Sequence, residues 1–364
     1  MKKHTLLLWA ICLTLPLCAQ QRGEIKIPNL NGFLTLKCDF HIHTVFSDGT
    51  VWPTIRVQEA YREGLDAIAI TDHVEAGYRP RRNDVVGSHN RAYEVAVAEA
   101  ERRDIILIRG AEVSRSMPPG HLNALFLIDA DELDKPDYTD ALRAAQSQNA
   151  FIKWNHPCWD AQQPDTTLWF PEHTALLEQG LIQGIEVVNE GMYCPEAHQW
   201  CLDKNLTMFG SDDIHGPLMP FAPGKHRAMT LVFAQSRTQE GIMEALKAGR
   251  TAVYFEEYII GREVFLKELF ENAVEITVEK TAANRARITF NNTSDLVFHL
   301  RKAPHDPRLT YFRNVTLHPY IIQPQSTQTI SVRLNDGIEH GDVNLIIENF
   351  LVGVGEGMRY TVKI

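Results

Sequence analysis

A histidine-bearing segment, Asp39-Phe40-His41-Ile42-His43-Thr44-Val45-Phe46-Ser47-Asp48-Gly49, follows the apolar run Phe33-Leu34-Thr35-Leu36. This order predicts a strand that opens into a functional loop. On an extended chain His41 and His43 project from one face, about 7 Å apart. One metal ion can therefore bind both imidazoles, and Asp48 adds a carboxylate from the loop. The alternative is two ordinary surface histidines beside a turn, because short motifs often match by chance.

Four later segments repeat this pattern, since each places ligand-type residues directly after a short apolar run. The residues concerned are Thr71-Asp72-His73; Gly110-Ala111-Glu112, followed by His121; Asn155-His156-Pro157; and Asp212-Asp213-Ile214-His215. Chance rarely puts ligands at so many strand ends. The repetition favours one shared site.

Short strand-like runs and helix-like segments alternate between Leu36 and about Phe255. Helices are predicted over residues 52–63, 90–102, 138–148, 173–179, 195–204 and 239–248, and strands over 67–71, 105–111, 151–154, 185–189, 207–210 and 229–234. Such alternation indicates parallel strands with helical crossovers. Ligands after several different strands favour a closed or nearly closed barrel over an open doubly wound sheet, and the chain has no Gly-x-Gly-x-x-Gly turn.

After Gly261 the pattern changes to period-two strands separated by polar turns. About seven short strands predict a small immunoglobulin-like β-sandwich, with no helix expected in it. Its scattered histidines have no metal-ligand spacing; they are His299, His305, His318 and His340. Clamping the barrel, binding a partner and self-association all remain open as its role.

The first nineteen residues predict a secretory signal peptide, with Lys2-Lys3, an apolar run from Leu6 to Leu17 and a small-residue cleavage site. Export to the periplasm or beyond follows, with a barrel over 20–262 and a sandwich over 263–364. Lipidation at Cys18 is the less favoured alternative. No later segment offers an uninterrupted membrane span.

The net charge is −10, and it becomes −12 when Lys2 and Lys3 are removed with the signal. An acidic surface argues against a long nucleic acid partner. The oligomeric state is left open by the sequence.

Four cysteines remain after the signal: Cys38, Cys158, Cys194 and Cys201. Export permits disulfides, and Cys194 with Cys201 is the first pair to test. The favoured alternative is that all four are buried thiols.

Taken in order, the ligand-type motifs resemble the polymerase and histidinol phosphatase (PHP) family of metal-dependent phosphoesterases over roughly residues 35 to 260. The motifs are His41-Ile42-His43 with Ser47-Asp48-Gly49, Thr71-Asp72-His73, Gly110-Ala111-Glu112, His121, Asn155-His156-Pro157 and Asp213-Ile214-His215. The resemblance implies a distorted seven-stranded β/α barrel, which is TIM-like, and exported bacterial phosphodiesterases of this family have a similar layout.

The resemblance also implies the ligands of two or three divalent ions. A first ion would take His41, His43, Glu112 and Asp213; a second would take Glu112, His121 and His156; a third would take Asp48, His73 and His215. Asp48 stands where some family members have histidine. The Asp-x-His spacing selects Asp213 over Asp212, and Asp72 is expected to orient an imidazole. The donors suit Zn, Mn or Fe.

The activity expected from this site is hydrolysis of small phosphodiesters or phosphomonoesters by a metal-bridging hydroxide. We expect Glu112, Asp213 and His73 to be the catalytic residues. Substrate contacts are predicted for Arg79, Arg81, Arg82, His89 and Asn189, although the three arginines equally fit a solvated basic loop. Two alternatives use the same chain: a metal-containing binding protein that acts through its sandwich, and an exonuclease on short oligonucleotides.

Overall fold

The computed structural model describes residues 21–78, 87–222, 224–303, 309–311, 319–335 and 341–364. The predicted signal peptide with Cys18, the arginines Arg79, Arg81 and Arg82, and His305, His318 and His340 lie outside these ranges. In the described residues no helix is long and apolar enough to cross a membrane.

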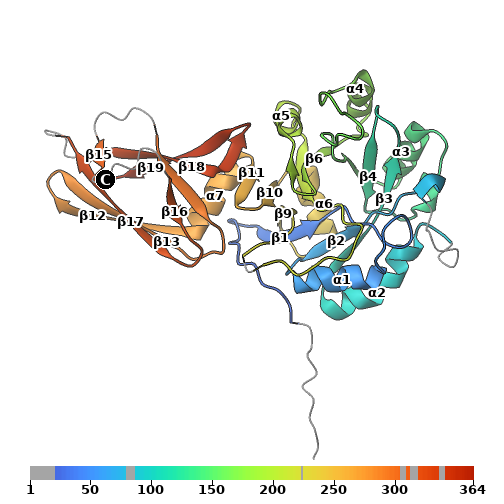
Figure 1. Ribbon diagram of the computed structural model, residues 1–364, viewed down its shortest axis with the longest axis horizontal. Coiled ribbons are helices and arrows are strands. Elements are labelled where there is room, and N and C mark those ends of the chain that lie inside the picture. The colour runs from blue at the N-terminus through green and yellow to red at the C-terminus, as the bar shows by residue number, and fades with distance from the viewer. Residues whose placement is uncertain (1–20, 79–86, 223, 304–308, 312–318, 336–340) are drawn as a thin grey trace, which may run out of the picture.

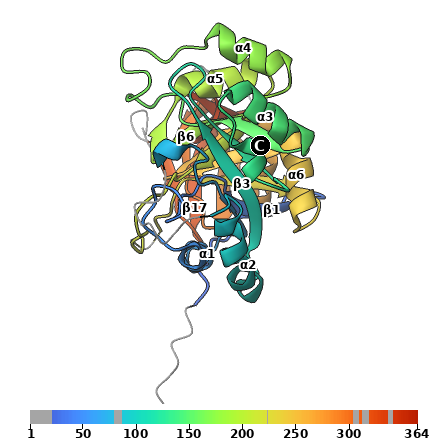
Figure 2. The ribbon, with the colours of Figure 1, turned by 90° about the vertical axis from the view of Figure 1, so that its right-hand side faces the viewer.

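The α/β domain contains the alternating strands and helices that the sequence predicts. Its elements are β1 (Leu34–Asp39), α1 (Pro53–Arg62), β2 (Ala67–Ile70), η1 (Ala76–Tyr78), α2 (Arg91–Arg103), β3 (Ile106–Ser114), β4 (His121–Leu125), η2 (Asp131–Leu133), α3 (Tyr138–Ser147), β5 (Phe151–Trp154), α4 (Pro171–Glu178), β6 (Gly184–Asn189), β7 (Met192–Tyr193), α5 (Pro195–Asp203), β8 (Thr207–Ser211), β9 (Met229–Ala234), α6 (Gln239–Lys247), β10 (Thr251–Phe255) and β11 (Tyr258–Gly261). Figure 2 shows α1 and α2 below the strands, with α3 to α6 above and beside them.

The sheet is mixed rather than purely parallel. Strands β1, β2 and β3 pair in parallel, as do β5, β6 and β8, but β4 runs antiparallel to both β3 and β5. The link between β3 and β4 spans only residues 115–120, which is too short for a helical crossover. Strand β9 also runs antiparallel to β1, and β10 runs antiparallel to β9 on its other side.

The closed barrel that the sequence predicts is not found as a closed hydrogen-bonded ladder among the described residues. Strand β8 pairs with β6 and meets β9 through a side chain: the Thr230 hydroxyl accepts from Gly210 N (3.1 Å) and donates to Gly210 O (2.9 Å). A Cβ on Gly210 would lie 2.4 Å from Cγ1 of Val253, so the close approach requires glycine. The strands therefore curl round without completing the ladder.

The C-terminal domain begins with a helix that the sequence analysis missed. Its elements are α7 (Glu263–Ala273), β12 (Val274–Ala282), β13 (Arg285–Asn292), β14 (Phe298–Lys302), β15 (Leu309–Tyr311), β16 (Tyr320–Ile322), β17 (Thr327–Leu334), β18 (Asp342–Gly353) and β19 (Glu356–Lys363). Leu266, Leu269, Phe270 and Ala273 are buried at helical spacing on α7. They belong to one core cluster with residues of both domains.

The two domains share a sheet. Strands β12, β13, β17 and β15 form a four-stranded sheet, while β16, β14, β18 and β19 form the facing one. Strand β18 pairs in parallel with β11, with Ile259 opposite Phe350 and Ile260 opposite Leu351. The sandwich, orange to red in Figure 1, is thus joined to the α/β domain by backbone pairing as well as by side-chain packing.

The pair first to test, Cys194 with Cys201, is not bonded, and the favoured expectation of four buried thiols is wrong for two of the cysteines. Cys194 is bonded to Cys158, with their Cα atoms 5.6 Å apart, whereas Cys38 and Cys201 are buried free thiols. Cys194 caps α5 and Cys201 lies two turns further on, about 10 Å along the axis at 1.5 Å per residue, which is beyond disulfide reach. Burial raises the pKa of the Cys201 thiol to about 12, so this cysteine is inert.

Candidate metal centre

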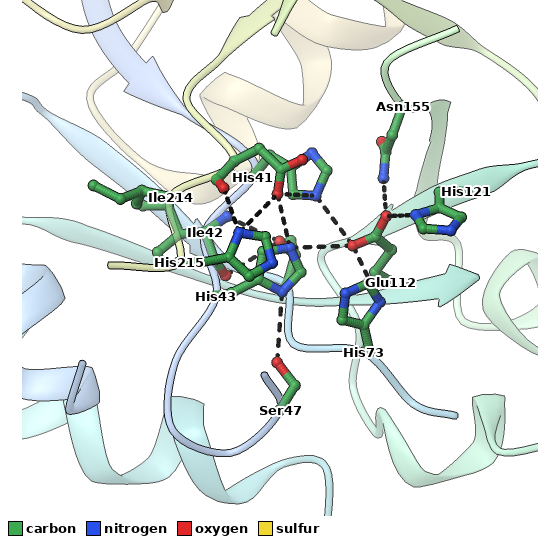
Figure 3. Close-up of polar contacts among 12 residues, drawn as sticks. His41, Ile42, His43, Ser47, His73, Glu112, His121, Asn155, Ile214 and His215 are labelled. Carbon is green, nitrogen blue, oxygen red and sulfur yellow. Dashed lines mark hydrogen bonds and ion pairs between the residues drawn. The ribbon is translucent and has the colours of Figure 1, made fainter. Parts of the chain in front are cut away.

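Six strands deliver the predicted ligands to one edge of the sheet (Figure 3). The ligands follow β1, β2, β5 and β8, occur within β3, and open β4, whose reversed direction brings its first residue to this same edge. The nine residues are His41, His43, Asp48, His73, Glu112, His121, His156, Asp213 and His215. Isolated bridges between Ile42 and Ile214 and between His73 and Glu112 tie the loops together.

Glu112 lies at the centre of the cluster and is fully buried. Its Oε2 lies 3.1, 3.2 and 3.4 Å from ring nitrogens of three histidines, and its Oε1 lies 3.0 and 3.7 Å from those of two others. The first three are His41, His43 and His73, and the other two are His121 and His156. One carboxylate thus faces two groups of imidazoles, the position of a bridging ligand.

Two further carboxylates complete the groups. Asp213 Oδ1 lies 3.1 Å from His41 Nε2 and 3.0 Å from His43 Nε2. Asp48 lies 3.3 Å from His215 Nε2 and 3.6 Å from His73 Nε2. The donor atoms gather within 4.8 Å of one another in four sets that together include all nine residues: His43, Asp48, His73 and His215; His41, His156 and Asp213; His41, His43 and Glu112; and Glu112, His121 and His156.

The spacing and hydrogen bonding of these donors fit divalent cations. Four ligands at the usual 2.0–2.1 Å from an ion lie about 3.3 Å from one another, close to the separations found here. Three buried side-chain atoms of the candidate ligands have no hydrogen-bond partner in the described structure. They are His43 Nε2, Asp213 Oδ1 and His156 Nδ1. Buried polar atoms without partners are rare in proteins, and a cation would satisfy the first two.

The electrostatics of the cluster also favour cations. Burial lowers the pKa of His41, but the carboxylates of Asp213, Glu186 and Glu112 outweigh it and raise the pKa to about 9. The neighbouring histidines hold the pKa of Glu112 and of Asp213 well below the usual values despite burial. Ionised carboxylates gathered in a dry site require a positive counterpart.

Two ligand residues and one neighbour occupy the left-handed backbone region. His156 has φ +30° and Asp213 has φ +51°, whereas Glu190, at φ +45°, opens the two-residue hairpin turn between β6 and β7, where this conformation is usual. Non-glycine residues rarely adopt this conformation, and it costs energy that the surrounding structure must supply. Such strain concentrates at functional sites.

Glu186 holds His41 and the backbone of His156 in place, and the sequence analysis missed it. It is fully buried, and it accepts hydrogen bonds from His41 Nδ1, from the backbone N–H of His156 and from the Asn189 amide, each at 2.9 Å. Lys153 makes a buried ion pair with the same carboxylate. A glutamate inside the apolar strand β6 was the available signal, because acidic residues are almost never fully buried without a partner.

Arg56 is a second support that the sequence did not reveal. Only 1% of the residue is exposed. It donates to His43 O (2.9 Å), Ile214 O (3.0 Å) and Gly216 O (2.8 Å), and pairs with Glu59 (2.8 Å). The guanidinium therefore joins the loop after β1 to the loop after β8, and both loops carry ligands.

Asp72 contacts no imidazole of the described residues directly, contrary to the prediction, and reaches His43 only through Ser47, whose hydroxyl lies 3.5 Å from Nδ1. Asp72 accepts from the Thr44 backbone N–H (2.7 Å) and from the hydroxyls of Thr44 and Ser47 (2.6 Å each), so it holds the loop after β1. The imidazole of His73 is instead oriented by the Ser114 hydroxyl, 2.6 Å from Nδ1. Ser114, at the end of β3, thus orients the imidazole of His73.

The predicted substrate residues divide into three outcomes. Asn189 lines the cleft above the ligands. His89 does not: its backbone N–H donates to Asp131 at 2.6 Å, and its ring lies 3.9 Å from Asp134, beside η2. The three arginines lie outside the described residues.

The ligands open into a cleft of about 240 Å³. Its wall combines seven of the nine candidate ligands with four other residues, namely Tyr78, Trp159, Asn189 and Glu190. This volume is below the usual range for sites that enclose drug-sized ligands, so the described cleft suits a small group.

Comparison with known proteins finds a family match in each of the two domains. The PHP domain family matches residues 39–210, and the DUF5001 Ig-like domain family matches residues 272–363. A two-domain protein from Bacteroides vulgatus ATCC 8482, containing a predicted PHP-like metal-dependent phosphoesterase, shares 50% sequence identity. The match covers 95% of this chain and 100% of that one, with a TM-score of 0.91.

Two more distant structures also match. A structure from Bifidobacterium adolescentis ATCC 15703, described as that of a metal-dependent phosphoesterase, has 17% identity and a TM-score of 0.38. The match covers 57% of this chain and 95% of that one. An amidohydrolase from Chromobacterium violaceum, solved with sulfate and no metal, has 16% identity and a TM-score of 0.37, over 60% and 98%. None of the curated proteins matches the chain.

The fold and the candidate metal centre place the chain in a class of two-domain proteins with a PHP-like domain. The chain belongs to the PHP-like metal-dependent phosphoesterase family and carries a C-terminal Ig-like domain. This membership supports metal-dependent hydrolysis of phosphoester bonds in general.

Proposed function

We propose that this protein hydrolyses small phosphodiesters, with phosphomonoesters as poorer substrates, using two or three divalent ions of Zn, Mn or Fe. The observation that carries the proposal is the position of Glu112, whose two oxygens face separate groups of imidazoles. A bridging carboxylate of this kind is what a two-metal hydrolytic site needs.

Divalent ions, when bound, polarise phosphoryl oxygens, lower the pKa of a water molecule and stabilise the charge that develops during displacement. The chain's own residues fix the geometry for this chemistry. Asn155 donates to Glu112 Oε1 at 2.9 Å and so sets the plane of the shared carboxylate. Glu186 fixes His41 through Nδ1, which directs Nε2 towards Glu112 and Asp213. Support of this kind is typical of metal-binding histidines.

The preference for diesters rests on charge. Among the described residues that line the cleft there is no lysine or arginine, whereas there are four carboxylates. A diester carries one negative charge at neutral pH and a monoester carries close to two. Binding a diester therefore needs less positive charge from protein side chains, beyond that of the metal ions, than binding a monoester. The acidic chain, with a net charge of −10, also disfavours long nucleic acids.

The experiment is a panel of esters assayed with protein loaded with Mn²⁺ or Zn²⁺. We expect saturable turnover of an aryl phosphodiester, a higher kcat/KM than for the matching monoester, and loss of turnover in Glu112→Ala. Glu101→Ala on the outer helix α2 is the matched control. Absence of turnover across the panel, with metals bound, would favour a binding protein. A strong preference for a dinucleotide over the aryl diester would favour an exonuclease.

Export of the mature protein is part of the proposal and rests on the N-terminal sequence alone. Cell fractionation and the mass of the purified protein test it. A mass that begins near residue 20 supports cleavage of a signal peptide, and a lipid-modified Cys18 would support anchoring instead.

A further inference from the structure

One wall of the cleft is made by residues that the candidate cation groups do not use. They are Tyr78, Trp159, Asn189 and Glu190. Tyr78 stacks on His73 with ring centroids 3.8 Å apart, so one face of its ring is covered. Asn189 donates to Glu186 at 2.9 Å. Trp159 and Glu190 therefore carry the most surface that a substrate can use.

Glu190 presents a carboxylate without a partner. Within the described part of the chain its side chain makes no hydrogen bond or ion pair, although it lines the cleft. Its backbone is held at φ +45°, with its N–H donating to Ser211 O at 3.3 Å. An acidic residue on a tight hairpin turn, with a carboxylate that satisfies nothing in the described fold, is placed to accept hydrogen bonds from a ligand.

Trp159 supplies an apolar surface on the same cleft. The residue is 38% exposed, and its indole meets the rings of His121 and His156 at 63° and 80°, with centroids 5.7 and 5.2 Å away. Its backbone N–H donates to His156 O at 2.9 Å. The ring is thus fixed beside two candidate ligands while part of its surface stays in solvent.

The disulfide holds these two parts of the wall together. Cys158 precedes Trp159, and Cys194 follows the short hairpin of β6 and β7 whose turn carries Glu190. The bond joins both segments directly, so the tryptophan and the carboxylate need little ordering when a ligand binds. Binding sites gain affinity and selectivity from such preorganisation.

We propose that Trp159 and Glu190 form a subsite for the second ester group of the substrate, and that this group is an uncharged, polyhydroxylated ring such as a sugar or cyclitol. The inference rests on the function proposed above. Ring C–H groups would lie against the indole, and neighbouring hydroxyls would donate to the carboxylate.

Charge and shape favour this class over two others. An anionic group would be repelled by Glu190 and would meet no lysine or arginine among the described lining residues. A quaternary ammonium group is typically bound in a cage of several aromatic rings, and among the described residues that line the cleft Trp159 is the one aromatic residue counted as exposed. Divalent ions in the adjacent groups would also repel it. A neutral ring with hydroxyl donors has neither disadvantage.

The test compares three phosphodiesters that share one p-nitrophenyl leaving group and carry ethanol, choline or myo-inositol as the second ester group. The full-length protein loaded with Mn²⁺ should hydrolyse the inositol ester with a kcat/KM about 10-fold above that of the ethyl ester, as expected for hydrogen bonds to a charged acceptor. Glu190→Gln and Trp159→Ala should each remove most of this preference by raising KM for the inositol ester. Trp159→Phe should retain part of it, and Glu101→Gln should retain all of it.

Each other outcome overturns the subsite. Equal kcat/KM values for the inositol and ethyl esters would show that no such subsite exists. A higher kcat/KM for the choline ester than for the inositol ester would assign the subsite to ammonium groups. An equal fall in kcat for all three esters in Glu190→Gln, with unchanged metal content by elemental analysis, would place Glu190 at the reacting centre. If metal-loaded wild-type protein hydrolyses none of the three, the proposed function fails as well. Turnover without selectivity leaves that function intact.

Discussion

Replacing Arg56 by lysine tests whether the two ligand-bearing loops are held by one side chain. The guanidinium donates to three backbone carbonyls, those of His43, Ile214 and Gly216. A single ammonium on a shorter reach cannot satisfy all three. Hydrogen bonds from charged donors contribute about 1.5–3 kcal/mol each, so the loss of two lowers the free energy of unfolding by about 3 kcal/mol or more. Looser ligands should also weaken metal binding by about 10- to 100-fold.

Chemical denaturation of metal-free protein measures the first effect, and calorimetric titration with Mn²⁺ measures the second. Arg102→Lys is the control, because Arg102 lies on the outer helix α2 and pairs with Glu99 at 2.6 Å, away from both ligand-bearing loops. The reasoning is refuted if Arg56→Lys stays within about 0.5 kcal/mol of wild type, the range of ordinary surface substitutions, and binds Mn²⁺ with unchanged affinity.

Glu186→Gln should weaken metal binding about 10- to 100-fold by freeing His41, and should destabilise the protein by about 3–5 kcal/mol because a buried ammonium loses its partner; unchanged calorimetric titration would count against this. His198 is fully buried, and burial lowers its pKa to about 4. In the unfolded chain this imidazole is protonated below about pH 6.5, whereas in the folded protein it is protonated only below about pH 4. The free energy of unfolding therefore falls on acidification, by about 2 kcal/mol between pH 8 and 5. His198→Gln should remove that share of the pH dependence in denaturant titrations. The double variant Cys158→Ser, Cys194→Ser opens a loop of 36 residues and should lose about 3–4 kcal/mol; a free energy of unfolding equal to wild type would show that the bond contributes nothing.

The clustering of the candidate ligands was predictable because strand ends and donor residues coincide in the sequence. His41, His43 and Asp213 follow apolar runs, and parallel strands bring such ends to one edge. His121 reaches that edge for a different reason, because β4 is antiparallel and begins there. Its position was predicted by resemblance and explained only by the structure.

The residues behind the ligands could not be predicted in the same way. Arg56 and Glu186 act through contacts with chain segments more than 100 residues away, which no local pattern reveals. The Cys158–Cys194 bond, with a sequence separation of 36, and the pairing of Ile259 with Phe350 between β11 and β18 are likewise not revealed by any local pattern. Helix α7 was missed for a local reason. It has only 11 residues, and strands β11 and β12 adjoin it on both sides, so its helical apolar spacing is hidden by the period-two pattern of its neighbours.

Anomalous diffraction from crystals of metal-loaded protein, recorded at the absorption edge of the bound metal, tests the central claim most directly. We expect two or three peaks inside the ligand cluster, one of them between the Glu112 carboxylate and the imidazoles of His41 and His43, and one between Glu112, His121 and His156. Loss of these peaks in Glu112→Ala would agree with a shared carboxylate. Full loading with peaks only outside the cluster, or no peaks in protein that hydrolyses phosphodiesters, would contradict the account.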